Sequence, residues 1–364
     1  MKIEILDVQP IQLPGMDYVG WPTLARLPSG ELLAVYSGGR QRHACPYGQL
    51  HLLRSQDQGR TWQGPVVLAD GPLDDRDGGL LVTSRGTVIA NWFTSLAWEM
   101  YFIRSPERFQ TIAPQHRDAW LQRHASLTPD IRQQELGIWA IRSTDGGRTW
   151  SPRIDSVTGS PHGPFELTTG RLMHAGKFKI HHHTASTNGS PYAAKLGVAI
   201  SDDDGQSWQA FSEIAPMPGH TADNYHELHG VEAADGRIVV HIRNHNETFF
   251  HQTLQTESHD GGRTWSQVHP TGIMGFPAFL LRMHDGRIMS TVANREDPKT
   301  VLAVVSDDHG DTWSEPLFIA RNAGGDMGYP STIEVEPGQF MTLWYDNPKQ
   351  EPHTHLRWAR WRLV

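Results

Sequence analysis

The chain has 364 residues, of which 32 are Lys or Arg and 40 are Asp or Glu, and its formal net charge is −8. This acidic balance, without any basic run, argues against nucleic-acid binding, which depends on cationic side chains. The single Cys45 cannot form an internal disulfide or a cysteine-rich zinc site. No stretch approaches the roughly 18 apolar residues of a membrane span. The acidic residues within Met1–Asp7 argue against a secretion signal, so we expect a cytoplasmic protein.

An apolar strand, a turn containing glycine and a second apolar strand recur six times along the chain. The turn glycines are Gly30, Gly86, Gly170, Gly236, Gly286 and Gly338, with spacings of 56, 84, 66, 50 and 52 residues. Repeats of about 50 residues with four strands each are typical of a β-propeller. We therefore predict an all-β fold, a six-bladed β-propeller formed by residues 1–364 as one domain. A seven-bladed ring is the alternative.

Two irregular units complete this predicted ring. The 84-residue interval indicates an insertion in the second blade at about residues 106–134, where Asp118–Leu121 and Ile131–Leu136 have helical patterns. The last unit ends in His355–Val364, a strand that we expect to pair beside a strand from the N-terminus. Such pairing would close the ring and remove an exposed sheet edge.

One pattern, Ser-x-Asp-x-Gly-x-Thr/Ser-Trp, accompanies five of the six hairpins. The copies occupy residues 55–62, 143–150, 201–208, 258–265 and 306–313. Their Asp and hydroxyl oxygens can accept hydrogen bonds from the backbone of a tight turn. The glycine suits a left-handed backbone position, and the tryptophan can pack between neighbouring units. We expect these Asp-box turns to be structural and to lie away from the substrate.

The first strands of all blades converge on the central channel of a propeller, so their polar side chains share one funnel. The candidates in chain order are Tyr18, Trp21, Arg40, Arg42, His43, Asp74–Asp77, His162, His181–His183, Tyr225–Glu227, Arg243, His245, Phe276, Arg295, Asp326, Tyr329, Tyr345 and Asp346. A sealed core would not tolerate so many polar groups. We therefore expect a solvated site that binds a polar, acidic ligand.

Five Asp-boxes on a six-fold hairpin repeat resemble the sialidase (neuraminidase) superfamily, and the resemblance covers residues 18–346. Its members carry a Glu at the entry of the fourth inner strand, an Arg just past that hairpin and a Tyr opening the last inner strand. Glu227, Arg243 and Tyr329 match these positions. The resemblance implies that Tyr329 is the nucleophile, that Glu227 takes its proton and that Arg243 holds a substrate carboxylate. A phenol suits this role because a sugar with a carboxylate on its anomeric carbon would repel a carboxylate nucleophile.

Two features of the family pattern are missing here. The family's first inner strand begins with Arg-Ile-Pro, whereas this chain has Gly20-Trp21-Pro22, and residues 39–48 lack the family's acid/base Asp. Arg295 matches the third arginine of the family's carboxylate clamp only loosely. Arg40, Arg42 or Arg76 can supply a guanidinium instead. His43, Asp75 or Asp77 can donate the proton to the leaving oxygen.

Histidines are unusually frequent, and three lie together at His181–His183. With His162, His174, His226 and His229 they can be considered as a metal site, but strand side chains alternate between faces, so the triplet cannot all point one way. We predict no metal and no cofactor. Trp21, His162 and His226 are expected to contact substrate instead, and a histidine can act as acid or base near neutral pH.

Three functions remain open at this point. The first is an exo-acting, sialidase-like glycoside hydrolase that releases a terminal acidic sugar, either sialic acid or a related nonulosonic or uronic acid. The second is a polysaccharide lyase acting on uronic-acid glycans, and the third is a non-catalytic sugar-binding propeller. The expected partner in each case is an acidic mono- or oligosaccharide, with no nucleic acid and no membrane. The oligomeric state, the sugar and its linkage stay open.

Overall fold

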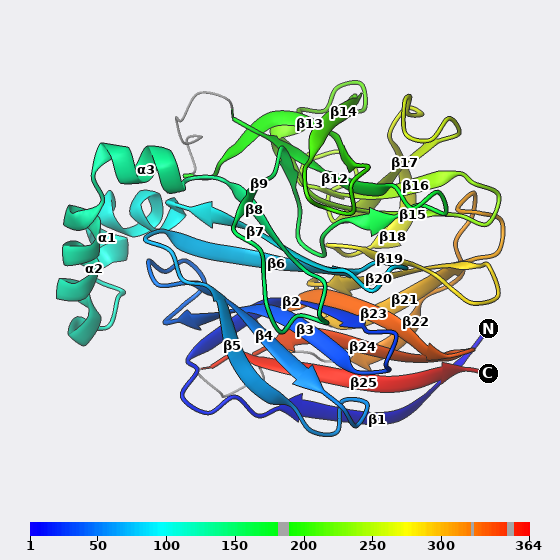
Figure 1. The fold of residues 1–364 in the computed structure, drawn as a ribbon, viewed down its shortest axis with the longest axis horizontal. Helices are drawn as coiled ribbons and strands as arrows, with labels where there is room; N and C mark the ends of the chain where they lie inside the picture. Colours follow the sequence, from blue (N-terminus) through cyan, green and yellow to red (C-terminus); the bar gives the residue numbers. More distant parts are fainter. Residues whose placement is uncertain (181–188, 322–323, 348–352) are drawn as a thin grey trace.

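A computed structural model describes residues 1–180, 189–321, 324–347 and 353–364 of the chain. Its strands form six antiparallel sheets, each of four or five strands, that stand around a central axis (Figure 1). The predicted six-bladed β-propeller is therefore confirmed. The N- and C-termini lie close together at one side of the ring (Figure 1).

The blades follow one another in chain order, each beginning with its innermost strand. Blade one contains β2 (Tyr18–Arg26), β3 (Leu32–Arg40), β4 (Gln49–Ser55) and β5 (Gln63–Ala69). Blade two contains β6 (Asp74–Val82), β7 (Val88–Ser95), β8 (Ile138–Ser143) and β9 (Ile154–Asp155). Blade three contains β10 (Thr158–Gly159), β11 (Phe165–Glu166), β12 (Leu172–Lys179), β13 (Tyr192–Ser201) and β14 (Gln209–Ile214).

The second half of the ring has the same order. The short helix η2 (Ala222–Asn224) leads into blade four, which contains β15 (Tyr225–Glu232), β16 (Ile238–Asn244), β17 (Gln252–Ser258) and β18 (His269–Met274). Blade five contains β19 (Phe279–Arg282), β20 (Ile288–Asn294), β21 (Thr300–Ser306) and β22 (Leu317–Arg321). Blade six contains β23 (Gly328–Glu336), β24 (Gln339–Asp346), β25 (His355–Leu363) and the N-terminal strand β1 (Ile3–Ile11).

Blade six joins the two ends of the chain. β1 pairs antiparallel with β25, from Ile3 opposite Leu363 to Ile11 opposite Leu356. The terminal strand therefore pairs with the N-terminus as predicted. The backbone groups of β25 are hydrogen-bonded to β1, so blade six has four paired strands like blades one and five.

The five Asp-boxes form one repeated hydrogen-bonded turn. In the first box, the Ser55 hydroxyl donates to Asp57 Oδ1 (2.9 Å) and accepts from the Gly59 amide (2.8 Å), and the Thr61 hydroxyl donates to Asp57 Oδ2 (2.6 Å). The same bonds recur in the other four boxes. Each turn needs two successive left-handed residues, the predicted glycine and the residue before it, which is Gln58 (φ 62°) in this box.

The box tryptophans connect neighbouring blades. Trp265 of blade four donates from Nε1 to Ser212 of blade three (2.9 Å), and Trp313 of blade five donates to Gln255 of blade four (2.9 Å). Trp208 of blade three packs in one buried cluster with Ile89 of blade two. Each box therefore contacts the preceding blade, as the sequence predicts.

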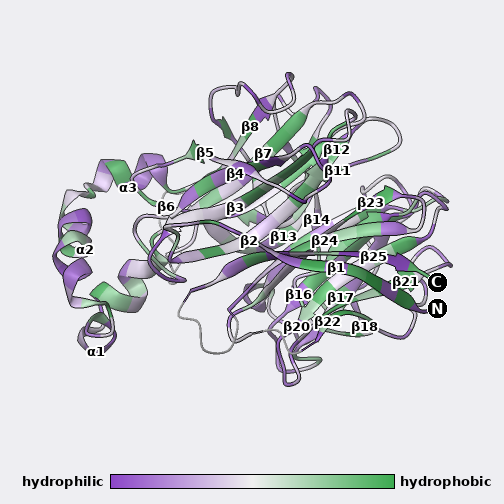
Figure 2. Cartoon of the chain, turned by 90° about the horizontal axis from the view of Figure 1, so that it is seen from below, coloured by the Kyte–Doolittle hydropathy of each residue, from purple (hydrophilic) through white to green (hydrophobic). Residues whose placement is uncertain are grey.

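A helical arm interrupts blade two between β7 and β8. It consists of the π-helix η1 (Glu99–Ile103) and the helices α1 (Pro106–Phe109), α2 (Pro114–Ser126) and α3 (Pro129–Glu135). The arm projects from the rim of the ring, and its outer surface is largely hydrophilic (Figures 1 and 2). Its inner side packs Trp98 and Trp120 in a buried cluster that includes Cys45 of blade one. No helix in the described part of the chain is both long and apolar enough to cross a membrane.

Candidate active site

The inner strands bend sharply where they face the central axis. Four residues that are not glycine have a left-handed backbone there: Trp21 (φ 54°), Asp77 (φ 53°), His162 (φ 72°) and Tyr329 (φ 56°). Register shifts in β2, β6 and β23 occur at three of them, and His162 lies in the break between β10 and β11. Such conformations cost on the order of 1–3 kcal/mol each and are concentrated at functional sites. The bends explain why blade three has a split first strand, which the sequence analysis did not predict.

Tyr329, Glu227 and Arg243 meet at the hub of the ring. The Tyr329 hydroxyl donates to Glu227 Oε1 at 2.6 Å. Arg243 Nη1 donates to both carboxylate oxygens of Glu227 at 2.9 Å and lies 3.3 Å from the Tyr329 oxygen. The structure therefore brings together side chains from three strands, β23, β15 and β16, that are up to 102 residues apart in the sequence.

The electrostatics of this trio place the shared proton on the tyrosine. Burial alone would raise the pKa of Glu227, but Arg243, His226 and the Tyr329 hydroxyl outweigh it and lower that pKa to about 2. Burial and the Glu227 charge raise the pKa of Tyr329 well above its ordinary value. The resting pair is thus a phenol hydrogen-bonded to a carboxylate, the arrangement in which the carboxylate can accept the phenol proton during a reaction.

Two further arginines face this trio. Arg295 Cζ lies 5.5 Å from the Tyr329 ring centre, and its Nε and Nη2 are buried without a hydrogen-bond partner among the described residues. Arg76 Cζ lies 4.6 Å from the Trp21 ring centre, and its buried Nε makes no hydrogen bond to a described residue, although it lies 3.8 Å from Asp77 Oδ1. Buried donors without partners cost free energy unless an acceptor meets them, so this hub is suited to an anion.

Asp77 and His162 also carry unsatisfied polar atoms at the hub. Asp77 Oδ1 lies 3.8 Å from Arg76 Nε and, like His162 Nε2, makes no hydrogen bond to a described residue. Burial, opposed by Arg76, raises the pKa of Asp77 to about 6. Burial lowers the pKa of His162 to about 3, so this imidazole is neutral.

His43 belongs to a second polar cluster, at the edge of the hub. Its Nδ1 lies 2.9 Å from the Tyr18 hydroxyl and 3.3 Å from Asp326 Oδ2. Asp326 accepts hydrogen bonds from Tyr18 (2.6 Å) and from Tyr345 (2.9 Å). His43, Tyr18 and Tyr345 together overcome the effect of burial and hold the pKa of Asp326 below its usual range.

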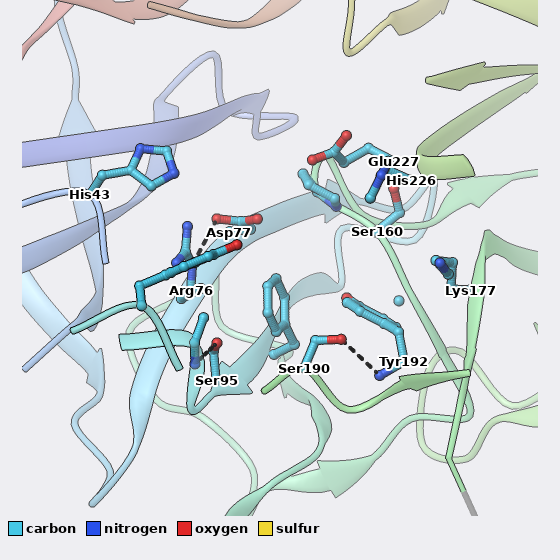
Figure 3. Close-up of a pocket in the computed structure, with 15 residues that line it drawn as sticks. His43, Arg76, Asp77, Ser95, Ser160, Lys177, Ser190, Tyr192, His226 and Glu227 are labelled. Carbon is cyan, nitrogen blue, oxygen red and sulfur yellow. Dashed lines mark hydrogen bonds and ion pairs between the residues drawn. The ribbon is translucent and has the colours of Figure 1, made fainter. Parts of the chain in front are cut away.

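A cavity of about 230 Å³ opens beside these groups. His43, Arg76, Asp77, His226 and Glu227 line it, and Figure 3 shows the side chains of Asp77, Arg76 and His43 along one side with Glu227 and His226 across from them. Five of the predicted site residues therefore share one pocket, and Tyr329 and Arg243 adjoin it through Glu227.

Comparison with known proteins agrees with this architecture. The BNR repeat-like domain family matches residues 109–342. The chain belongs to this family. Sialidases of Micromonospora viridifaciens (24% identity over 94% of this chain and 51% of that protein) and of Paraclostridium sordellii (22% identity over 70% and 58%) are curated relatives. This BNR repeat-like protein is thus a divergent member of the sialidase superfamily, and it spans little more than half the length of these two relatives.

Solved structures share the fold of this BNR repeat-like protein at low identity. A protein of unknown function from Dyadobacter fermentans superposes with a TM-score of 0.76, at 19% identity over 100% of this chain and 99% of that one. The intramolecular trans-sialidase from Ruminococcus gnavus, solved with oseltamivir carboxylate, superposes with a TM-score of 0.66, at 15% identity over 95% and 94%.

Three predicted site residues of the BNR repeat-like protein, described in turn below, are held by contacts outside the hub cavity. Asp75 points to the opposite face of β6 from Arg76, because strand side chains alternate, and it accepts from Trp92 Nε1 (2.7 Å). Arg42 turns outward, where its Cζ lies 4.4 Å from the Phe102 ring centre and Nη1 donates to Thr111. These positions place both residues outside the hub cavity, which corrects the prediction of a catalytic Asp75. Arg42 instead lines a second cavity beside the helical arm.

Arg40 is corrected in the same way. Its guanidinium is buried behind the hub in a two-pronged pair with Asp74 (2.5 and 3.0 Å). Arg40 Nη2 also donates to the His43 carbonyl oxygen (2.7 Å) and so holds the loop that carries His43. Because both of its Nη atoms are occupied, Arg40 positions the site rather than facing a ligand.

Other residues of the pocket were not among the predicted site residues. Lys177, Tyr192, Phe93 and Ser160 line the cavity from blades two and three. Lys177 comes from the second strand of blade three, and burial lowers its pKa. In the sequence, Lys177 stands out only as a lysine near the polar end of the largely apolar segment Leu172–Lys179. The predicted His181–His183 triplet lies outside the described residues, within which no group of three or more metal-ligating side chains occurs.

Proposed function

We propose that this protein is a glycoside hydrolase that removes a terminal acidic sugar from a glycan. The observation that carries the proposal is the 2.6 Å hydrogen bond from the Tyr329 hydroxyl to Glu227, at the wall of a hub cavity. A phenol paired with a buried carboxylate is an activated nucleophile. Membership of the sialidase superfamily and the sialidase relatives support the same class of reaction.

The charge of the hub supports an anionic sugar as the substrate. Arg243, Arg295 and Arg76 approach from three blades, and the last two have buried nitrogens that make no hydrogen bond to a described residue, although Arg76 is in ion pairs with Asp74 and Asp77. A planar guanidinium matches the geometry of a carboxylate. Arg76, which is stacked on Trp21, thus takes the place of the arginine that the Gly20-Trp21-Pro22 segment lacks.

The proposed reaction begins with Tyr329 attacking the anomeric carbon while Glu227 takes its proton. Arg243 remains bound to Glu227 and stabilises the carboxylate until it accepts that proton. A sugar bearing its carboxylate at the anomeric carbon would meet a neutral phenol rather than a negative nucleophile, so the two groups do not repel each other. A sialic acid or a related nonulosonic acid meets both requirements, whereas a uronic acid supplies the negative charge but carries its carboxylate away from the anomeric carbon.

The test uses Tyr329→Phe and Glu227→Gln with 4-nitrophenyl glycosides of sialic acid and of uronic acids. Each variant is expected to reduce kcat/KM at least about a hundredfold, because each removes one half of the nucleophile–base pair. Tyr225→Phe and Glu232→Gln are matched controls. The Tyr225 hydroxyl bonds His220 rather than a hub group. Glu232 is at the end of β15 away from the hub, where it accepts a hydrogen bond from the Thr168 amide.

Three outcomes would contradict the proposal. Unchanged rates in both hub variants would remove the assignment of Tyr329 and Glu227. A rise in absorbance from an unsaturated uronate would indicate a lyase instead. Thermal stabilisation by acidic sugars without any turnover would indicate a binding propeller, since a ligand of the folded state raises apparent stability.

A further inference from the structure

Two cavities meet at His43. The first is the hub cavity of about 230 Å³. The second, here called the outer groove, has a volume of about 580 Å³ and is lined by Asp17, Tyr18, Gln41, Arg42, His116 and Asp326, among others. It lies between blade one, the helical arm and the segment before β23. Of the described residues that line the two cavities, His43 alone belongs to both.

The His43 ring is held so that one nitrogen stays free. Nδ1 faces Tyr18 and Asp326, and Asp326 is itself fixed by hydrogen bonds from Tyr18 and Tyr345. The Trp21 ring packs edge-on against His43, with 5.0 Å between ring centres. Nε2 has no hydrogen-bond partner in the described part of the chain, and in Figure 3 the ring is directed toward the side of the cavity where Glu227 lies. A carboxylate at Nδ1 fixes the tautomer and orientation of the other nitrogen.

We propose that the outer groove binds the aglycone of the substrate and that His43 is the acid/base of the reaction, with Asp326 as its positioning residue. This inference rests on the proposed hydrolase function. The glycosidic oxygen joins the sugar in the hub to the aglycone outside it, so the proton donor must stand where the two sites meet. Residues 39–48 contain no acid, and His43 occupies that segment.

Asp77 fits this position less well. It lines the hub cavity but not the outer groove, and only 6% of its surface is exposed. A donor that borders the hub cavity alone would face the sugar held there rather than the bond to its aglycone. The side chain of His43 is 54% exposed, which gives it access to the bond and later to water.

The lining of the groove indicates the chemistry of the aglycone. Gln41, His116 and Arg42 carry donor groups, while Asp17 and Asp326 carry acceptors. Gln41 and His116 are 3.1 Å apart and bond each other in the structure, so a ligand would share or replace that bond. Positive and negative side chains are mixed there, unlike the arginine-rich hub. A neutral sugar residue, whose hydroxyls both donate and accept, matches this mixture.

The proposed reaction has two steps. In the first, the protonated form of His43, whose pKa burial lowers, gives its Nε2 proton to the glycosidic oxygen as the bond from that oxygen to the anomeric carbon breaks. The Tyr329 oxygen bonds to the same carbon, and its proton passes to Glu227. In the second, neutral His43 takes a proton from water, whose oxygen attacks the anomeric carbon. The electron pair of the tyrosyl bond returns to Tyr329, which regains its proton from Glu227.

The test compares two substrates that carry the same acidic sugar, one linked to lactose and one linked to 4-nitrophenol. Nitrophenolate leaves without protonation, whereas a sugar alkoxide does not. His43→Ala is therefore expected to lower kcat/KM at least about a hundredfold on the lactose substrate and less than about threefold on the nitrophenyl substrate. Because His43 is also the base of the second step, kcat on the nitrophenyl substrate should fall even though kcat/KM does not. Added azide should restore that kcat and yield a glycosyl azide, because this anion needs no base to attack.

Three further variants sharpen the test. Asp326→Asn should show the same difference between substrates at a smaller magnitude, as expected for a positioning residue. His116→Ala should raise KM for the lactose substrate and leave the nitrophenyl substrate unchanged. His259→Ala, at an exposed histidine of the fourth Asp-box, is the control and should change neither.

The outcomes separate the two proposals. If wild-type protein cleaves acidic glycosides but His43→Ala loses equal activity on both substrates, or if only Asp77→Asn discriminates between them, the acid/base assignment is overturned and the hydrolase function stands. An unchanged KM for the lactose substrate in His116→Ala would overturn the aglycone groove. If wild-type protein cleaves neither substrate, the proposed hydrolase function fails and this inference fails with it.

Discussion

The Asp-boxes and the hub use the same unusual backbone conformation for opposite purposes. In the boxes, left-handed residues such as Gln58 and His309 lie in turns whose Ser, Asp and Thr groups bond one another. At the hub, left-handed Asp77 and His162 have buried polar atoms that make no hydrogen bond to a described residue. Positive φ by itself therefore does not indicate function. Positive φ together with buried, unsatisfied polar atoms indicates a place where a ligand completes the structure.

The largest expected effect tests the structural role of the boxes. Trp208→Ala should lower the free energy of unfolding by about 3–5 kcal/mol, because it removes a large side chain packed between blades two and three. Denaturant unfolding measures this loss. Activity of the folded variant, assayed below its melting temperature, should stay at the wild-type level, since the box lies outside the pocket. A large loss of activity per folded molecule would contradict the division between boxes and hub.

The prediction of intermediate size tests how much stability the protein loses by burying the ionised Asp77 carboxylate at the hub. Asp77 has its pKa raised from 3.8 to about 6 by burial, so the folded protein binds this proton more tightly than the unfolded chain. Stability contributed by the neutral form is therefore lost as pH rises from about 4 through 6. Asp77→Asn should be up to about 3 kcal/mol more stable than wild type at pH 8 and gain nothing near pH 4, measured by unfolding at both values.

Asp57 is the matched control for this comparison. Hydrogen bonds from the Thr61 side chain and amide lower its pKa to about 2, so its ionised form stabilises the fold above its unfolded pKa. Asp57→Asn should therefore lower stability at pH 8, the opposite sign to Asp77→Asn. If both variants changed the free energy of unfolding at pH 8 in the same direction, the proposed difference between the box and the hub would be wrong.

The smallest expected effect concerns backbone strain in the boxes. Two boxes already have a glycine before the conserved one, Gly146 and Gly261, whereas Gln58 has φ 62°. Gln58→Gly should raise the free energy of unfolding by about 0.5–1 kcal/mol, because glycine adopts this conformation without the steric cost. If the variant is less stable instead, the contacts of the Gln58 side chain stabilise the fold by more than its left-handed backbone costs.

Much of the site follows from the repeat. Glu227 and Arg243 lie on the first two strands of blade four, and Tyr329 lies near the start of the first strand of blade six, so closing the ring brings them to one axis. The register of single strands is harder to predict. The bulge in β6 turns Asp77 into the pocket and leaves Asp75 against Trp92, and the sequence Asp74-Asp75-Arg76-Asp77 contains no signal for its position. Arg42 is carried away by the helical arm, whose packing on blade one involves contacts distant in sequence.

The amino-acid sequence alone determined the architecture, because hairpin glycines, Asp-boxes and the terminal strand act through local turns and alternating apolar residues. These local patterns recur in most blades, so they can be recognised in the sequence without knowledge of the structure. Only the tertiary structure decided which polar side chains face the hub, which are paired behind it as Arg40 is with Asp74, and where His43 stands between two cavities. Those outcomes depend on bulges and on packing between distant segments, where a shift of one residue reverses the direction of a side chain.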